Sequence, residues 1–166
     1  MAKIPFTKLG LKVNNNVHQL SYNDNIIEVK EYLPIKEKLE LVSRIINLAS
    51  DDNGYYNPMK IDIFMVMEIL YAYTNLNFTD KMKEELFKTY DVVVSSGIAQ
   101  RVINIMGTEY DIIRDNVWST IKSIYEYKNS AAGVISLISQ DYSNVNLDLD
   151  AIQEKIENPE QMEFLK

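Results

Sequence analysis

One run of apolar residues limits most strongly what this chain can fold into. Residues 61–73 are apolar at every position except Asp62 and Glu68. Asn57 and Pro58 precede the run, and an asparagine cap with a proline in the first turn is typical of a helix start. A helix that is apolar nearly all round is buried in a protein. The run is much shorter than the roughly 20 residues that cross a bilayer, so it predicts a buried central helix in a soluble protein.

The first part of the chain, residues 6–33, has the pattern of short β-strands. Apolar residues alternate with polar residues or glycine, most clearly over residues 9–13. Asparagine-rich turns separate this segment from two further strands, expected over residues 17–22 and 26–32. The pattern predicts an antiparallel three-stranded meander with one face in water. A sheet this small must lie on the helices or on another subunit.

After Pro34, apolar residues at spacings of three and four predict a series of helices. We expect them over residues 35–49, 80–96 and 98–106, and from residue 108 onward with a kink or break near Ser130. The helix over 35–49 has one apolar and one polar face. Its apolar face is expected to contain Ile35, Leu39, Val42, Ile46 and Ala49, and its outward residues Lys36, Glu37, Lys38 and Glu40.

The acidic residues are concentrated at the C-terminal end. From residue 141 onward, seven acidic residues and two lysines contribute −5 of the net charge of −7. Residues 144–150 are expected to be extended, and residues 150–157 to form a short amphipathic helix. Because neutralising phosphates supplies most of the affinity for nucleic acids, we do not expect this acidic chain to bind DNA or RNA.

These patterns predict an α+β fold that is predominantly helical, with a small three-stranded antiparallel meander followed by a bundle of about five to six helices. We expect one domain over residues 1–166, made of the meander (6–33), a helical core (34–142) and an acidic C-terminal segment (143–166). The absence of cysteine excludes disulfides and thiol nucleophiles. The first residues lack the apolar stretch of a signal peptide, so the protein is expected to stay in the cytoplasm.

Three charged or titratable positions are candidates for a site. His18 is the only histidine, and it lies in the predicted sheet, so we expect it to be exposed or structural. Asp62 and Glu68 are six residues apart, which places them on nearly opposite sides of a helix. They therefore cannot form an acid–base pair, and each is expected to have a lysine, arginine or backbone partner or to lie at the helix edge.

A calcium-loop-like spacing occurs near the C-terminal end. Asn146, Asp148, Asp150 and Glu157 occupy ligand positions of an EF-hand-like loop, but Ala151 stands where the sharp turn requires glycine. We therefore do not expect calcium binding. Phosphate loops, serine elbows and zinc spacings are also missing. We assign no catalytic, cofactor-binding or metal residues and expect no enzyme; the methionines and tyrosines fit either a core or an interface.

Several short segments resemble recurrent segments of small proteins from tailed phages and prophages of low-GC Gram-positive bacteria. They are residues 27–35 (IEVKEYLPI), 71–75 (YAYTN), 78–80 (FTD) and 158–160 (NPE). The resemblance implies a part in virion morphogenesis, as a tail assembly chaperone or a head or neck component. It also implies other phage structural proteins or a second copy as partners, and a location in the host cytoplasm or the virion. The alternative is a small regulatory or anti-defence protein whose acidic surface binds a host enzyme.

Overall fold

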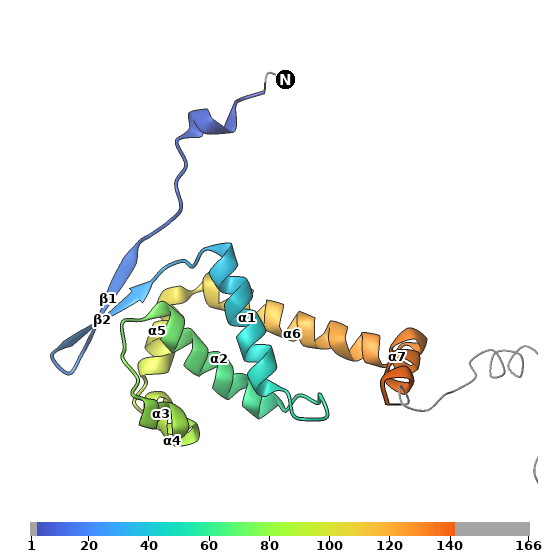
Figure 1. Ribbon diagram of the computed structural model, residues 1–166. Helices are drawn as coiled ribbons and strands as arrows, with labels where there is room; N and C mark the ends of the chain where they lie inside the picture. Colours follow the sequence, from blue (N-terminus) through green and yellow to red (C-terminus); the bar gives the residue numbers. More distant parts are fainter. Residues whose placement is uncertain (1–2, 142–166) are drawn as a thin grey trace, which may run out of the picture. The chain divides into compact units, whose positions relative to one another are not determined.

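A computed structural model describes the backbone of residues 3–141 and the side chains of residues 3–136 (Figure 1). The described chain is α+β and mostly helical, as expected. Its contacts group into two compact units, residues up to Ile121 and residues from Lys122 onward, which we describe separately. The described elements are η1 (Phe6–Leu9), β1 (Val17–Tyr22), β2 (Asn25–Lys30), α1 (Ile35–Ala49), α2 (Pro58–Tyr73), α3 (Asp80–Glu84), α4 (Leu86–Ser95), α5 (Ile98–Met106), α6 (Thr108–Lys128) and α7 (Ala131–Asp141).

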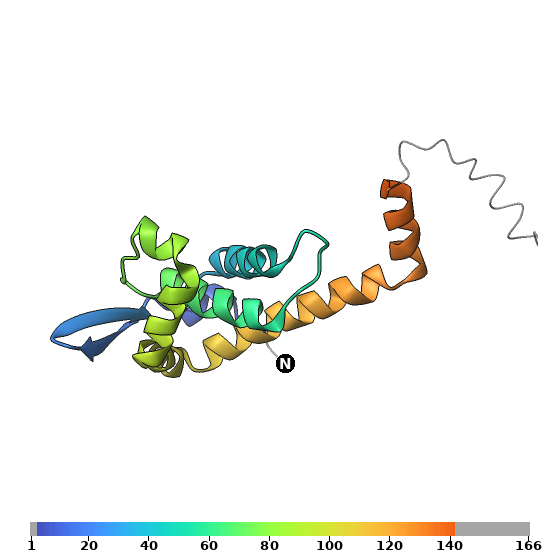
Figure 2. The same cartoon turned by 90° about the horizontal axis from the view of Figure 1, so that it is seen from below.

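Strands β1 and β2 form an antiparallel hairpin that lies against α5 (Figure 2). Asn23 and Asp24 both have positive φ, which matches the twist of a two-residue hairpin turn. Leu20, Ile27 and Val29 are buried on one face, while the other face is exposed. The predicted wet face of the sheet is therefore present.

The third strand expected within residues 6–33 is not formed. Pro5 leads into the short 3-10 helix η1, which ends at Gly10 with φ of 62°. The alternation over residues 9–13 favours an extended strand, but a strand also needs a hydrogen-bonding neighbour. One edge of β2 is bonded to β1, and the other contacts the segment after α2, where Glu28 and Asn75 exchange two hydrogen bonds of 3.0 and 3.2 Å. The sheet of the described chain thus has two strands.

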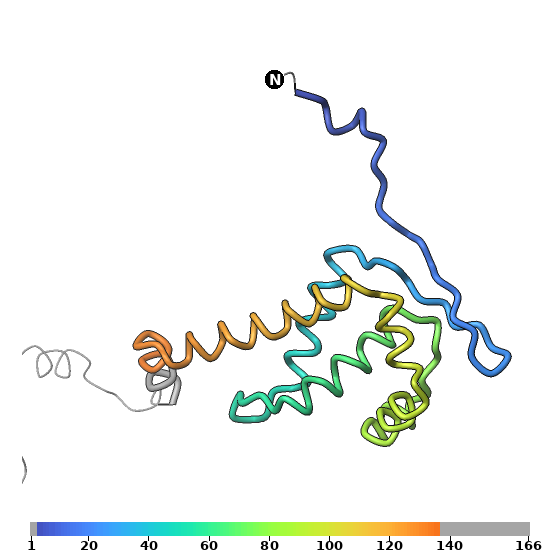
Figure 3. Tube along the Cα trace, turned by 180° about the vertical axis from the view of Figure 1, so that it is seen from behind, coloured from blue at the N-terminus to red at the C-terminus, as the bar shows by residue number. Residues whose placement is uncertain are grey.

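Helix α2 is the central helix that the apolar run predicts. The Asn57 side chain accepts hydrogen bonds from the N–H groups of Met59 and Lys60, and Pro58 occupies the first turn. Helix α2 packs against α1 and against α4 and α5 (Figure 3). Its buried residues are Ile61, Ile63, Met65, Met67, Ile69, Leu70 and Tyr73.

The expected apolar face of α1 is partly wrong. Ile35 and Leu39 are exposed, whereas Leu41 and Ile45 are buried. Lys38, which the pattern predicts to face outward, is also buried. The buried face of α1 is therefore rotated from the expected stripe, and the buried charge of Lys38 has a partner on α6, described below.

The expected helix over residues 80–96 is divided at Glu85 into α3 and α4. Glu85 has a ψ of 45°, which is far from the helical value, so the helix does not continue through this residue. Thr79 caps α3 as expected, through a hydrogen bond from the Met82 N–H. Helix α5 has the expected bounds, Ile98–Met106.

The break expected near Ser130 is present, since α6 ends at Lys128 and α7 begins at Ala131. The extended segment, the short helix and the calcium-loop-like residues expected beyond residue 142 lie outside the described residues. None of the helices over residues 3–141 is long and apolar enough to cross a membrane.

Candidate functional site

The N-terminal arm, which we define as residues 3–16, exposes a series of apolar side chains. All of its residues are exposed, and Figures 1 and 3 show it running away from the helices. Its apolar side chains have exposed fractions from 53% to 72%; they are Ile4, Phe6, Leu9, Leu11 and Val13. Exposed apolar side chains gathered in one segment make the arm a candidate interaction surface.

The arm leads directly into an open strand edge. The Asn16 carbonyl accepts a 3.0 Å hydrogen bond from the Glu31 N–H. Because antiparallel pairs alternate, the N–H and C=O groups of Val17, Gln19 and Ser21 then point away from β2. The Ser21 carbonyl accepts a 2.9 Å hydrogen bond from Arg101. The backbone groups of Val17 and Gln19 have no such partner within the described part of the chain, and we call these two residues the open β1 edge.

His18 is exposed beside this edge, as expected. Its Nε2 lies 3.6 Å from Glu31 Oε2, and both side chains are in contact with solvent. Asn16 donates a 3.0 Å hydrogen bond to the same carboxylate. This hydrogen bond from Asn16 is the main cause that lowers the pKa of Glu31. These contacts connect Asn16, the last residue of the arm, and His18 of β1 to Glu31, which follows β2.

A buried charged cluster connects distant parts of the first unit; we call Glu109, Lys38 and Tyr73 the Glu109 cluster. Lys38 Nζ lies 2.8 Å from Glu109 Oε1 and 3.0 Å from Oε2, with 11% and 8% of the two side chains exposed. The Tyr73 hydroxyl and the Leu33 N–H donate to the same Oε1, at 2.9 and 3.2 Å. The Lys38 ammonium also lies 3.9 Å from the centre of the Tyr32 ring.

The surroundings of the Glu109 cluster indicate a structural role, because it connects α1, α2 and α6. Burial, followed by the hydrogen bond to Glu109, raises the pKa of Tyr73 above its ordinary value. Each charge is enclosed by donors and acceptors that match it, which is what a buried ion pair requires. The apolar pattern predicted Lys38 to face outward, so this cluster was not expected. The one sign of it in the sequence is that Lys38 falls in helical register with the buried residues Leu41 and Ile45.

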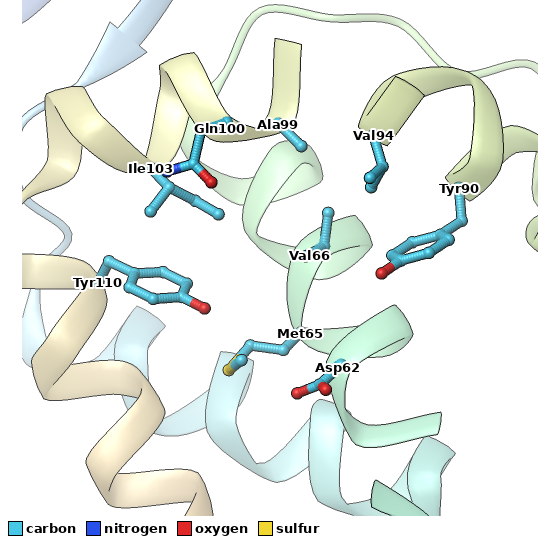
Figure 4. A pocket seen from close by; sticks show the side chains of 9 residues that line it. All are labelled: Asp62, Met65, Val66, Tyr90, Val94, Ala99, Gln100, Ile103 and Tyr110. Atoms are coloured by element: carbon cyan, nitrogen blue, oxygen red, sulfur yellow. The ribbon is translucent and has the colours of Figure 1, made fainter. Parts of the chain in front are cut away.

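A second group of polar side chains lines the Asp62 pocket, a surface pocket of about 420 Å³ (Figure 4). Residues of α2, α4, α5 and α6 contribute to it. Its polar side chains are those of Asp62, Tyr90, Gln100 and Tyr110, and its apolar side chains include Met65, Val66 and Ile103. Figure 4 shows the hydroxyls of Tyr90 and Tyr110 pointing toward each other across the pocket. Burial is the main cause that raises the pKa of Tyr110, and the charge of Asp62 adds to it.

The two carboxylates of α2 lie in different surroundings, as their spacing predicted. Glu68 Oε2 is 2.9 Å from Arg44 Nε, and only 12% of the Glu68 side chain is exposed. Asp62 is exposed at the rim of its pocket. No ion pair or hydrogen bond to the Asp62 side chain is present among the described residues, so this carboxylate is available to a ligand.

Comparison of the chain with protein-family models, with curated proteins and with solved structures finds no match in any of the three. Within residues 3–136, no three histidine, aspartate or glutamate side chains lie close enough to hold a metal ion. The candidate sites of the described chain are therefore the N-terminal arm, the open β1 edge and the Asp62 pocket.

Proposed function

We propose that this chain is a non-enzymatic phage assembly protein that acts through protein–protein contacts, as a tail assembly chaperone or as a head or neck component. One observation carries the proposal: the N-terminal arm exposes five large apolar side chains directly beside an open strand edge. The segments that resemble proteins of tailed phages, such as residues 27–35, support the virion context.

The arm has the features of a segment that pairs with a partner as a strand. In an extended conformation, Leu9, Leu11 and Val13 lie on one face, because side chains alternate along a strand. Full burial of each such side chain stabilises a complex by about 1.5–3 kcal/mol. The open β1 edge supplies backbone groups that can pair with another chain. The third strand that the alternation predicts would then form in the complex.

The proposal is tested by co-purification from cells that produce the phage's capsid and tail proteins. The wild-type chain is compared with a Leu9→Ser, Leu11→Ser variant. The matched control is Ile35→Ser, Leu39→Ser, which removes two similarly exposed apolar side chains from α1. We expect the wild type and the control to retain the same virion proteins and the arm variant to lose them.

Two results of this experiment contradict the proposal. Capture of no virion protein by the wild type removes the assembly role. Equal capture by all three chains removes the arm as the contact segment.

The alternative function is a regulatory or anti-defence protein that binds a host enzyme. The charge distribution favours it, because residues outside the basic arm carry a net charge of −10, obtained by subtracting the arm's +3 from −7. An acidic surface can imitate the charge of nucleic acid. Retention of a nucleic-acid-binding host enzyme in place of virion proteins, with loss in high salt, would support this function.

A further inference from the structure

We propose that the Asp62 pocket of one copy binds a lysine side chain from the N-terminal arm of a second copy, so that the arm links successive copies of the chain. The proposal rests on the proposed role of the arm as the contact segment, and it names a partner and a binding site for that arm.

The Asp62 pocket has the chemistry of a site for a cationic side chain. The Asp62 carboxylate is exposed and unpaired among the described residues, and the tyrosines Tyr90 and Tyr110 flank it. The carboxylate attracts an ammonium group through its charge, and the two tyrosine hydroxyls, which point into the pocket, offer oxygen acceptors for its N–H groups. A cation of the chain itself, Arg114, lies 5.9 Å from the Tyr110 ring but is paired with Asp111 and Asp115 at 2.9 and 3.0 Å.

The walls of the pocket suit the stem of such a side chain. Met65, Val66 and Ile103 provide apolar surface below the polar rim. A lysine buries its methylene stem along apolar surface while its ammonium group meets the carboxylate.

The N-terminal arm offers the matching residues. It contains three lysines, Lys3, Lys8 and Lys12, and no acidic residue. Lys8 and Lys12 are exposed, and in an extended arm they lie on the face opposite Leu9 and Leu11. A lysine from this face fits a pocket that has a carboxylate at its rim and apolar side chains along its walls.

Charge also favours binding of the arm to residues 17–140 of a second copy over binding to that copy's arm. Two arms would bring six lysines together, whereas residues 17–140 carry a net charge of −5. Arm-to-pocket binding uses two different surfaces of the chain. Such head-to-tail contacts produce closed rings or open chains, which suits an assembly protein.

The test is sedimentation velocity over a range of concentrations with the full chain. The pocket variant is Asp62→Lys, and the arm variant is Lys8→Glu with Lys12→Glu. The matched control is Glu40→Lys, which makes the same charge change at an exposed site on α1 with no ion pair among the described residues. Circular dichroism confirms that each variant is folded.

We expect the wild type and the control to associate as the concentration rises, and each of the two other variants to associate about tenfold more weakly, because like charges then face each other. Mixing the pocket variant with the arm variant should restore association. In that mixture the reversed pocket can meet an arm of opposite charge, which is possible only if the contact is between copies.

Three results would overturn this inference: a wild type that stays monomeric at every concentration, a pocket variant that associates like the wild type, or a mixture that fails to associate. These results leave the proposed assembly role standing if the wild type still retains virion proteins and the Leu9, Leu11 variant does not. If instead self-association is intact and no virion protein is retained, the arm-to-pocket contact stands and the assembly role is removed.

Discussion

At the scale of single residues, the buried Glu109 carboxylate has the most hydrogen-bond partners of the Glu109 cluster. It accepts hydrogen bonds from Lys38, Tyr73 and the Leu33 backbone N–H. Glu109→Gln should lower the free energy of unfolding by about 3–5 kcal/mol, since it leaves the buried Lys38 ammonium without its counter-charge. Urea unfolding followed by circular dichroism measures this loss.

The control is the double variant Glu109→Gln, Lys38→Met, which also removes the buried ammonium charge that Glu109→Gln leaves unpaired. It should be more stable than Glu109→Gln alone. If the double variant is the less stable of the two, Lys38 is not paired with Glu109 in solution.

Two neighbouring tyrosines of α2 should respond in opposite directions to the same change. The Tyr71 hydroxyl is buried without a hydrogen-bond partner in the described chain. The Tyr71 and Phe78 rings pack edge to face, with 4.9 Å between their centroids. Tyr71→Phe should therefore raise the unfolding free energy by about 1 kcal/mol. Tyr73→Phe, the matched control, should lower it by about 1–3 kcal/mol, because Glu109 loses a donor. Equal effects measured by urea unfolding would contradict the described surroundings of the two hydroxyls.

Stability should fall in alkali. Burial raises the pKa of Tyr73 in the folded chain, so the unfolded state loses this proton first, near pH 10. The stabilisation is complete below about pH 10 and is lost as the pH rises toward the folded pKa, by up to about 1.4 kcal/mol per pH unit. Unfolding free energies measured from pH 8 to 11 should fall less steeply in Tyr73→Phe than in the wild type. An identical slope would show that Tyr73 ionises normally.

At the scale of elements, the turn between α6 and α7 depends on one glycine. A Cβ added at Gly133 would overlap the backbone carbonyl of Tyr127, and the Ser130 side chain accepts the Gly133 N–H at 3.1 Å. Gly133→Ala should displace the start of α7 and increase protease cleavage near residue 130. Asn129→Ala, at an exposed position of the same turn, should leave cleavage unchanged. Equal cleavage of both variants and the wild type would mean that the turn does not have this close contact.

The elements that the sequence predicts well are those specified locally. Helix α2 has its own cap at Asn57 and its apolar run, and α5 lies between Gly97 and Gly107. The elements that it mispredicts depend on distant partners. Residues 9–13 have a strand pattern but no neighbouring strand in the described chain, and Lys38 is buried because Glu109 lies opposite it, far along the sequence.

At the scale of the molecule, the candidate sites were the hardest part to predict. The Asp62 pocket combines side chains of α2, α4, α5 and α6, so its residues come together only in the folded chain. The N-terminal arm is exposed because its strand-like residues have no neighbouring strand in the described chain. A local sequence pattern does not predict whether such a neighbour is present. The spacing of Asp62 and Glu68 did predict correctly that they do not share a cleft.

The arm should contribute almost nothing to the stability of the isolated chain. Removing residues 3–13 takes away only exposed side chains, so the unfolding free energy should change by no more than about 0.5 kcal/mol. A large loss of stability in urea unfolding would show that the arm belongs to the core of its own chain.

The central claim is that the N-terminal arm becomes buried when this protein meets its partner. Hydrogen–deuterium exchange of the arm amides, measured for the chain alone and after addition of purified virion proteins, tests it most directly. We expect fast exchange over residues 9–13 in the dilute chain and strong protection in the complex. Unchanged fast exchange of these amides in a complex that demonstrably forms would contradict the account.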